Sequence, residues 1–343
     1  MIGTIIELCL FIIATAFFPP PPPPHTHTHN NERKYDFLGF SQTNSIRGIA
    51  ILMVILMHSS CNFGLRIFTP LGGIGVALFL ILSGYGLTES YKRKKLELFW
   101  KSKFSKIWIP YAIVLTVCTI WSLSFKPYVI VQYCLIDSPF WYISFLFYNY
   151  ILFYVCHKYK FLYKYRFTIF LVYAFILFAF DTRIRAEQCL CFVTGMWISD
   201  YKKIVYKFLS NKNMVLCTIF LLYGISASAL FLKQMPTLRG QMEHVRLFQN
   251  IMELLIKYPF AIATIVVFTT NIFDRIQRSL LIGNRFLGFC SKISLELYII
   301  HFSLRVMLNK EYQVFSILTF LGLSFVLSIL LYRLKNHIIL WIK

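Results

Sequence analysis

The chain has 343 residues, of which 58% are hydrophobic and only 14% are charged, and its mean hydropathy is +0.64. Because soluble domains carry about 25% charged residues, this composition excludes an ordinary soluble protein and indicates a membrane protein. The net charge of +21 would also suit a nucleic-acid-binding protein. The basic residues, however, lie in short segments between apolar runs, as in loops that face anionic lipid. We therefore expect membrane lipid, and no nucleic acid, as a partner.

The first 34 residues differ in composition from the rest of the chain. An apolar run, residues 1–18, precedes six consecutive prolines and then three histidines that alternate with threonine within residues 25–29. No positive charge precedes the apolar run, which argues against a signal peptide and favours a short anchor. A proline run forms a stiff rod, and the His–Thr repeat is low-complexity sequence. We predict that residues 1–34 are a leader, either dispensable or the product of a start site upstream of the working protein, ahead of a polytopic membrane domain, residues 35–343.

Apolar runs long enough to cross about 30 Å of hydrocarbon recur along the whole membrane domain. They predict an all-α integral membrane protein in which about ten transmembrane helices form one bundle, with residues 1–18 as a possible extra segment. The expected helices are 46–62, 71–90, 107–125, 140–157, 167–181, 187–200, 214–232, 258–273, 286–304 and 314–333.

Lysine and arginine are distributed unevenly between the loops. The loops after the second, fourth, sixth and eighth expected helices are rich in them, and the alternate loops are poorer except for residues 233–257. By the positive-inside rule the rich loops face the cytoplasm. Residues 31–45 and the C-terminus are then cytoplasmic, and we expect a multi-pass protein of the plasma (inner) membrane. If residues 1–18 also span, the extreme N-terminus lies outside.

The nine cysteines are scattered, and no Cys-x-x-Cys pair occurs among them. Their odd number and irregular spacing argue against a disulfide framework or a zinc site, and we predict no metal site. We expect free thiols that are buried and pack as small hydrophobic side chains.

The first expected helix carries two residues that are costly in a membrane, Arg47 and His58. Eleven steps of about 100° make nearly three turns, so both side chains share one helix face, roughly 16 Å apart along the axis. Each alone has an ordinary explanation, a basic flank or a core histidine. Together they suit acyl transfer: a guanidinium can clamp a phosphate, and an imidazole further in can act as general base or acyl carrier.

Residues 45–60, SIRGIAILMVILMHSS, resemble the opening helix of the membrane acyltransferase 3 family, with its Arg-x10-His motif. Other segments resemble later family motifs in the same order, over about residues 35–335. They are the second helix ending in Ser83-Gly84-Tyr85, the segment Lys103–Pro110 in place of Arg-x-x-Arg and Ile-x-Pro, the aromatic segment Phe140–Ile143, and the segment Ser294–His301 with the pattern Ser-x-x-x-Tyr-x-x-His.

The resemblance implies about ten helices, a cytoplasmic acyl-coenzyme A donor (usually acetyl-coenzyme A) and a glycan acceptor that is exported or on the cell surface. It implies that Arg47 contacts the donor, that His58 is catalytic, and that Lys103 and Lys106 face the coenzyme's phosphates. Lysine stands here where the family has arginine, which keeps the charge but loses the bidentate fork. The two lysines also fit an ordinary positive-inside cluster. No permanently bound cofactor is expected.

Several further residues are candidates for supporting roles. Glu89 could pair with Arg47 or balance the basic loop, and we favour the pairing. His301 could line the acceptor side or be structural, while Trp141 is either an interfacial aromatic or a sugar platform. Ser83 and Tyr85 belong to the second-helix motif. The small residues of that helix, Gly72, Gly73, Gly75, Ser83 and Gly84, should let the first two helices approach closely.

Glu296 lies inside an apolar stretch and needs a cationic partner, for which Lys292, one turn earlier on the same helix face, is the predicted residue.

Two other classes of function remain as alternatives. A polytopic transporter of a small molecule or glycan precursor would show inverted repeats and paired broken helices. A receptor or structural membrane protein would need no alignment of arginine and histidine. The sequence favours an enzyme, an O-acyltransferase that modifies a polysaccharide, most often by O-acetylation.

Overall fold

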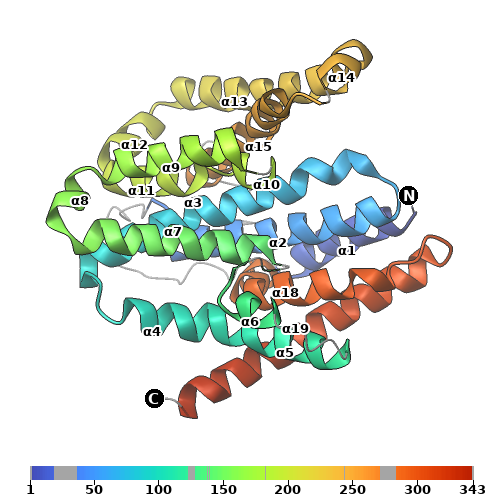
Figure 1. Cartoon of the computed structure of the whole chain (residues 1–343). Coiled ribbons are helices and arrows are strands. Elements are labelled where there is room, and N and C mark those ends of the chain that lie inside the picture. Colours follow the sequence, from blue (N-terminus) through green and yellow to red (C-terminus); the bar gives the residue numbers. More distant parts are fainter. Residues whose placement is uncertain are drawn as a thin grey trace, which may run out of the picture.

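The structure is a computed structural model that describes residues 2–18, 37–122, 128–136, 138, 140–181, 183–242, 244–270 and 283–341. The proline run and the His–Thr repeat of the leader lie outside the described residues. Helices are the only regular secondary structure in the part that is described (Figure 1). The all-α prediction is therefore confirmed.

The first half of the chain forms the helices that carry most of the sequence motifs. They are α1 (Ile2–Phe17), α2 (Phe40–Asn62), η1 (Arg66–Phe68), α3 (Thr69–Lys94), α4 (Phe99–Lys103), η2 (Phe104–Trp108), α5 (Ile109–Trp121), α6 (Tyr128–Tyr133), α7 (Trp141–Lys158) and α8 (Lys160–Lys164). The second half continues with α9 (Arg166–Phe180), α10 (Arg183–Ala186), α11 (Cys191–Asp200), α12 (Lys202–Leu209), α13 (Lys212–Gln234), α14 (Pro236–Met242), α15 (Arg246–Thr269), α17 (Arg285–Lys292), α18 (Ser294–Leu304), η5 (Arg305–Met307) and α19 (Gln313–Trp341).

Six helices of the described chain are long and apolar enough to cross a membrane. They are Phe40–Asn62, Arg66–Lys94, Phe99–Trp121, Lys212–Gln234, Arg246–Thr269 and Gln313–Trp341. A seventh span results if α17 and α18, which meet at a bend of 74°, count as one broken helix. The structure thus confirms several apolar spans but not the expected ten.

The remaining expected spans are shorter or more polar than the hydropathy pattern suggested. The segment 187–200 contains only the ten residues of α11, which rise roughly 15 Å, or half a bilayer. The segment 167–181 forms α9, with 15 residues. The segment 140–157 forms α7, with 18 residues, but its many tyrosines and polar side chains make it less apolar. All three helices nonetheless pack into the bundle (Figure 1).

Close backbone approach holds α3 at the centre of the bundle, between α2 and α11. A Cβ atom added at Gly75 would meet the carbonyl oxygen of Ala50 on α2 at 2.5 Å, and one at Gly72 would overlap Met57 on the same helix. These two glycines confirm the predicted approach of the first two long helices. On the opposite side, a Cβ at Gly84 would overlap the carbonyl oxygen of Phe192 on α11.

The prediction was wrong for three other small residues of α3. Gly73 contacts the side chain of Lys257 on α15, and Gly84 faces α11 rather than α2. Ser83 is a hydrogen-bonding neighbour of Tyr142 and Tyr150, both on α7. A helix surrounded on all sides presents small residues to every neighbour, so their presence predicts close packing but not which helix approaches.

The apolar part of the leader, α1, packs against α2, α17 and α19. Its buried Glu7 accepts a hydrogen bond from Ser59, the residue after His58, and Asn284 donates to the carbonyl oxygen of Thr15 at 2.8 Å. The segment thus shares a polar contact with α2, the helix that carries Arg47 and His58. That the chain works without its first 34 residues stays a prediction.

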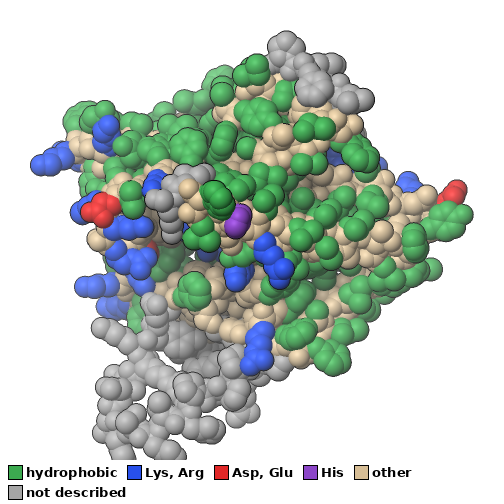
Figure 2. All heavy atoms as spheres, turned by 90° about the horizontal axis from the view of Figure 1, so that it is seen from below, with side chains coloured by type: hydrophobic (Ala, Val, Ile, Leu, Met, Phe, Trp, Pro, Cys, Tyr) green, Lys and Arg blue, Asp and Glu red, His purple; other side chains and the backbone are tan. Residues whose placement is uncertain are grey.

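The basic loops gather at one end of the bundle, which we call the lysine-rich end. It carries α4, α8, α12 and the last turn of α3, on the left of Figure 1, whereas the N-terminus and α14 lie at the opposite end. In Figure 2 Lys and Arg side chains crowd this end, while hydrophobic side chains cover most of the remaining described surface. This separation agrees with the alternation of rich and poor loops in the sequence.

We expect Gly84→Ala to destabilise the protein, because its new methyl group has to displace the α11 backbone. Overpacking of this kind costs about 1–3 kcal/mol. Gly224 is the matched control, since it lies within α13 and a Cβ there meets no atom within 4 Å. Melting of the purified protein in detergent should shift downward for Gly84→Ala and not for Gly224→Ala. Equal melting temperatures would show that the contact between α3 and α11 is looser than described.

Candidate active site

Arg47 and His58 lie on α2, a single uninterrupted helix; the Arg47 side chain lies near α7 and the His58 side chain lies against α18. Arg47 lies within electrostatic range of Tyr142 and Tyr150 on α7. The His58 ring lies 5.0 Å from that of His301 on α18, centroid to centroid. These two neighbouring helices contact each other through the rings of Tyr142 and Tyr298, 5.2 Å apart, an arrangement that agrees with the predicted common face.

Cations surround the Arg47 end of this face. Lys103 is partly buried, with Nζ 4.8 Å from the centroid of the Tyr150 ring. The charged groups that act most strongly on Lys103 are Lys106, Lys94 and Arg47, all of the same sign. Within the described chain neither Arg47 nor Lys103 forms an ion pair with a carboxylate. Such unneutralised cations attract a multivalent anion.

Lys106 lies on η2, a π-helical turn inserted between α4 and α5. Pro110, at the start of α5, has no N–H to offer the carbonyl of Lys106 four residues earlier, and its ring would collide with that carbonyl in a regular α-helix. A wider turn relieves this conflict, and π-turns often occur at functional sites. The proline of the Ile-x-Pro motif thus accounts for the π-helical turn that carries Lys106.

The opposite end of the face is built from two histidines in direct contact. His301 Nδ1 lies 2.7 Å from the carbonyl oxygen of Leu297, and His58 Nδ1 lies 3.0 Å from that of Val54. Because a carbonyl can only accept, each Nδ1 carries the proton and each Nε2 carries a lone pair. His58 Nδ1 is also 3.1 Å from His301 Nε2, so its proton is shared with that lone pair.

This arrangement fixes the tautomer of His58 and leaves its Nε2 lone pair available as a base. His301 is fully buried, while His58 is only partly buried. The buried ring therefore holds the more accessible one, as an orienting partner holds a catalytic histidine. His301 is thereby placed directly beside the predicted catalytic residue.

A row of tyrosines connects the two ends. Tyr142 lies near Arg47, its ring is 5.2 Å from that of Tyr298, and the ring of Tyr298 is 5.9 Å from that of His301. Ser83 is a hydrogen-bonding neighbour of the Tyr142 hydroxyl. Contacts between polar aromatic side chains therefore run continuously from the cationic end to the histidine pair.

A family model described as an acyltransferase domain, Acyl_transf_3, matches residues 42–333, most of the chain. The chain belongs to the acyltransferase 3 family. Searches of curated proteins and of solved structures gave no match. The family confirms the predicted resemblance and makes the protein a membrane acyltransferase in general terms, and the matched residues include Arg47, His58, Lys103, Lys106 and His301.

Of the other predicted residues, Tyr85 lies apart from these contacts, whereas the Trp141 ring lies 6.3 Å from that of Tyr142. The Tyr85 hydroxyl donates to the carbonyl oxygen of Phe37 at 3.1 Å, just before α2, and Trp141 packs its ring against Phe145. A supporting role for either stays a prediction.

The predicted pairing of Glu89 with Arg47 is wrong. Glu89 forms an ion pair with Lys92 at 3.0 Å and accepts a hydrogen bond from Ser199 at 2.6 Å. Lys92 in turn lies 3.4 Å from Asp200. The group formed by Glu89, Lys92 and Asp200 therefore joins α3 to the end of α11. Glu89 lies only one turn from Lys92 on its own helix, so it pairs with this nearer cation and not with Arg47.

Sequence reasoning missed Tyr150, and it named Tyr142 and Tyr298 only as parts of family-like segments, without a place beside Arg47 or His58. The chain contains 21 tyrosines, so residue type alone could not single these out. Tyr298 did stand within the Ser294–His301 motif, which was a usable signal. Tyr142 likewise stood within the aromatic segment Phe140–Ile143, whereas Tyr150 required knowledge of which face of α7 meets α2.

None of the nine cysteines is among the residues of the candidate active site described above. All nine cysteines are free, four of them buried and five exposed, so the expectation of buried thiols holds only for Cys156, Cys189, Cys191 and Cys290. Among the residues that the structure describes, no group of three His, Cys, Asp or Glu side chains is arranged to hold a metal ion.

A separate buried charge cluster is internally paired. Lys257 on α15 pairs with Glu187 and, at 2.8 Å, with Glu253, and Glu253 also pairs with Lys233 on α13. Two lysines and two glutamates thus neutralise one another. This cluster ties α13, α15 and the start of α11 together and leaves no free charge for a ligand.

The carboxylate of Glu296 pairs with Lys335 on α19, not with Lys292 as predicted. Both Glu296 and Lys335 are buried, while Lys292 lies over the Tyr332 ring with Nζ 5.3 Å from the centroid. Buried carboxylates in apolar surroundings require a partner that is equally withdrawn from solvent. The pair anchors the helix that carries His301.

We expect Lys335→Met to destabilise the protein by about 3–5 kcal/mol, because it leaves the buried carboxylate of Glu296 unpaired. Lys292→Met removes the same charge one turn from Glu296 and should cost much less. Thermal unfolding of both variants in the same detergent measures the difference. Equal losses, or a larger loss for Lys292→Met, would contradict this pairing.

Proposed function

We propose that the protein transfers an acyl group, in the first instance acetyl, from acyl-coenzyme A to a hydroxyl group of an exported or cell-surface glycan. The observation that carries the proposal is the protonation pattern of the histidine pair, which leaves the Nε2 lone pair of His58 free. The family supplies the general activity. The donor, the acceptor and the direction across the membrane are part of the proposal.

The donor's phosphates bind at the cationic end, to Arg47, Lys103 and Lys106. These side chains lie at the lysine-rich end, which the positive-inside rule assigns to the cytoplasm. Arg47 can hold a phosphate through two parallel hydrogen bonds, whereas each lysine contributes a point charge. The flexible arm of the coenzyme then extends along the row formed by Tyr150, Tyr142 and Tyr298 toward His58.

The reaction requires one proton transfer to and one from His58. Its Nε2 takes the proton of the acceptor hydroxyl as the oxygen attacks the thioester carbonyl. The carbon–sulfur bond then breaks, and the proton passes from Nε2 to the departing thiolate, giving an ester and free coenzyme A. While Nε2 holds the proton, the imidazolium keeps its Nδ1–H hydrogen bonds to Val54 and His301, which stabilise the charge.

A covalent route starts from the same lone pair. In that route Nε2 attacks the thioester itself, coenzyme A leaves, and the acyl-imidazole passes its acyl group to the hydroxyl in a second step. Rapid mixing with labelled acetyl-coenzyme A without acceptor separates the routes, since only the covalent one labels the protein. Both routes place the same demands on Arg47 and His301.

The acceptor approaches from the end opposite to the lysine-rich end. His58 lies four residues before the end of α2, beside the exposed Arg305, whose guanidinium stacks on the Phe302 ring at 4.1 Å. The Phe302 ring also meets that of His58 at 5.7 Å, edge to face. An aromatic face and a cation beside the base suit a sugar hydroxyl arriving from outside the membrane.

The transporter alternative has one observation in its favour, the broken helix formed by α17 and α18. Secondary transporters built from two repeats carry such broken helices in corresponding positions of both repeats. In the described chain only this one bent pair is present. The family match and the histidine pair therefore favour transfer over transport.

We expect His58→Ala to lower acyl transfer by at least about 10²-fold, because general base catalysis contributes 10²–10⁴-fold. Membranes are supplied with labelled acetyl-coenzyme A, label in glycan is counted, and protein in the membrane is quantified by immunoblot. His244→Ala is the control, since His244 is exposed and lies between α14 and α15. Undiminished transfer by His58→Ala would remove His58 from the mechanism.

We expect Arg47→Ala to weaken donor binding by roughly 10–100-fold, since a hydrogen bond to a charged group is worth about 1.5–3 kcal/mol. Arg47→Lys should recover part of the loss, because it restores charge without the fork. Arg93→Ala removes an exposed charge at the same end of the bundle and is the control. Equilibrium binding of acetyl-coenzyme A measures all three, and wild-type affinity in Arg47→Ala would refute the clamp.

A further inference from the structure

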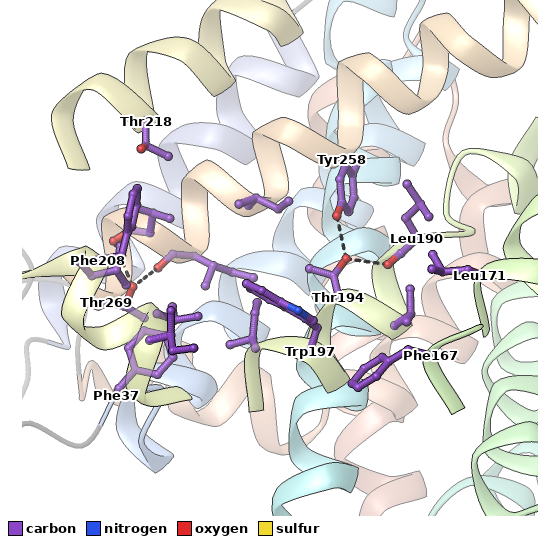
Figure 3. A pocket seen from close by; sticks show the side chains of 18 residues that line it. Phe37, Phe167, Leu171, Leu190, Thr194, Trp197, Phe208, Thr218, Tyr258 and Thr269 are labelled. Carbon is purple, nitrogen blue, oxygen red and sulfur yellow. Dashed lines mark hydrogen bonds between the residues drawn. The ribbon is translucent and has the colours of Figure 1, made fainter. Parts of the chain in front are cut away.

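Outside the candidate active site, the structure contains an apolar cavity of about 700 Å³. It lies between α9, α11, α12, α13 and α15, and Figure 3 shows its lining side chains converging from these helices. On α15 the lining extends from Tyr258 to Thr269, eleven residue steps or roughly 16 Å of helix. This elongated shape suits a chain-like ligand.

The hydroxyl groups that line the cavity are already hydrogen-bonded within the protein. Thr194 donates to the carbonyl oxygen of Leu190 at 2.8 Å and shares a hydrogen bond with the Tyr258 hydroxyl at 2.7 Å, as the dashed lines in Figure 3 mark. Thr218 and Thr269 donate to backbone carbonyls of their own helices. A polar ligand would lose its water without compensation, whereas an alkyl chain gains about 0.8 kcal/mol for each buried methylene group.

Charge lies directly beside this apolar space. Helix α12 contributes Ile204, Val205, Phe208 and Leu209 to the lining, while its lysines at 203 and 207 are exposed. No ion pair of either lysine is found in the described part of the chain. An amphipathic helix with this division lies at a membrane surface and attracts anionic headgroups.

The cavity is separate from the acyl-transfer face. On α11, Val193, Thr194 and Trp197 face the cavity, whereas Gly195 faces α3 so closely that an added Cβ would overlap the carbonyl oxygen of Ile81. The close contact between α3 and α11 therefore forms a wall between this part of the cavity and α2. A ligand in the cavity does not reach Arg47 or His58 through that wall.

We propose that this cavity holds one acyl tail of an anionic phospholipid, with the headgroup bound by Lys203 and Lys207. The apolar lining takes the tail, and the exposed lysines of α12 select the charge. The bound tail fills the space between α13 and its neighbours α11 and α12. This site is independent of the donor and acceptor proposed above.

Fluorescence quenching tests the site, because Trp197 lines the cavity. The detergent-purified protein is titrated with brominated-chain phosphatidylglycerol or phosphatidylcholine, and the Trp197→Phe variant supplies the background to subtract. We expect saturable quenching of Trp197 at a phosphatidylglycerol concentration on the order of tenfold lower than for phosphatidylcholine. Equal concentrations for the two lipids would overturn the proposed selectivity.

Two pairs of variants separate headgroup from tail. Lys203→Gln/Lys207→Gln should abolish the preference for phosphatidylglycerol, whereas Lys160→Gln/Lys164→Gln, with the same spacing and at the same end of the bundle, should not. If both double variants lose the preference equally, the attraction is general and the site is refuted.

The second pair tests occupation of the cavity. Val193→Phe fills it and should prevent saturable quenching, whereas Val172→Phe, exposed on α9 outside the lining, should leave quenching unchanged. Each variant is compared at a temperature below its own melting point in lipid-free detergent. Unchanged quenching in folded Val193→Phe would show that the tail binds elsewhere.

Discussion

The hydrogen bond between His58 Nδ1 and His301 Nε2, 3.1 Å long, is the interaction on which the candidate active site depends. Two backbone carbonyls, which can only accept, determine which nitrogen of each ring carries a proton. The bond therefore runs from the Nδ1–H of His58 to Nε2 of His301, and Nε2 of His58 keeps a free lone pair. Without α18 at this distance, the Val54 carbonyl would still define the tautomer of His58, but no neighbouring ring would hold its imidazole in place.

The rest of the bundle serves to keep α2, α7 and α18 in place around that bond. Small residues let α3 lie against α2 on one side and α11 on the other, where dispersion contacts replace the missing hydrophobic drive between helices in lipid. Buried ion pairs also hold the helices in place. Glu296 with Lys335 anchors α18, and Lys257 with two glutamates anchors α15. The cations near Arg47 differ from these pairs because they have no described carboxylate partner.

Much of this could be predicted from the sequence, because helical periodicity is a local property. The shared face of Arg47 and His58 and the approach of Gly72 and Gly75 to α2 followed from it, as did the long apolar helices. Properties that depend on distant segments could not be predicted. Lys335 is 39 residues from Glu296, and the tyrosines of α7 join the site only through packing. Hydropathy also counted α9 and α11 as spans, since it measures apolarity and not whether one helix continues.

The central claim is that one face of α2 binds the donor at Arg47 and presents its acyl carbon to His58. An experimental structure with a non-hydrolysable acetyl-coenzyme A analogue bound in a lipid nanodisc tests this most directly. The account predicts phosphate density against Arg47 and Lys103 and the acyl carbonyl within reach of His58 Nε2. Analogue bound away from α2, or histidine rings that have moved out of hydrogen-bonding distance around a bound acyl group, would contradict it.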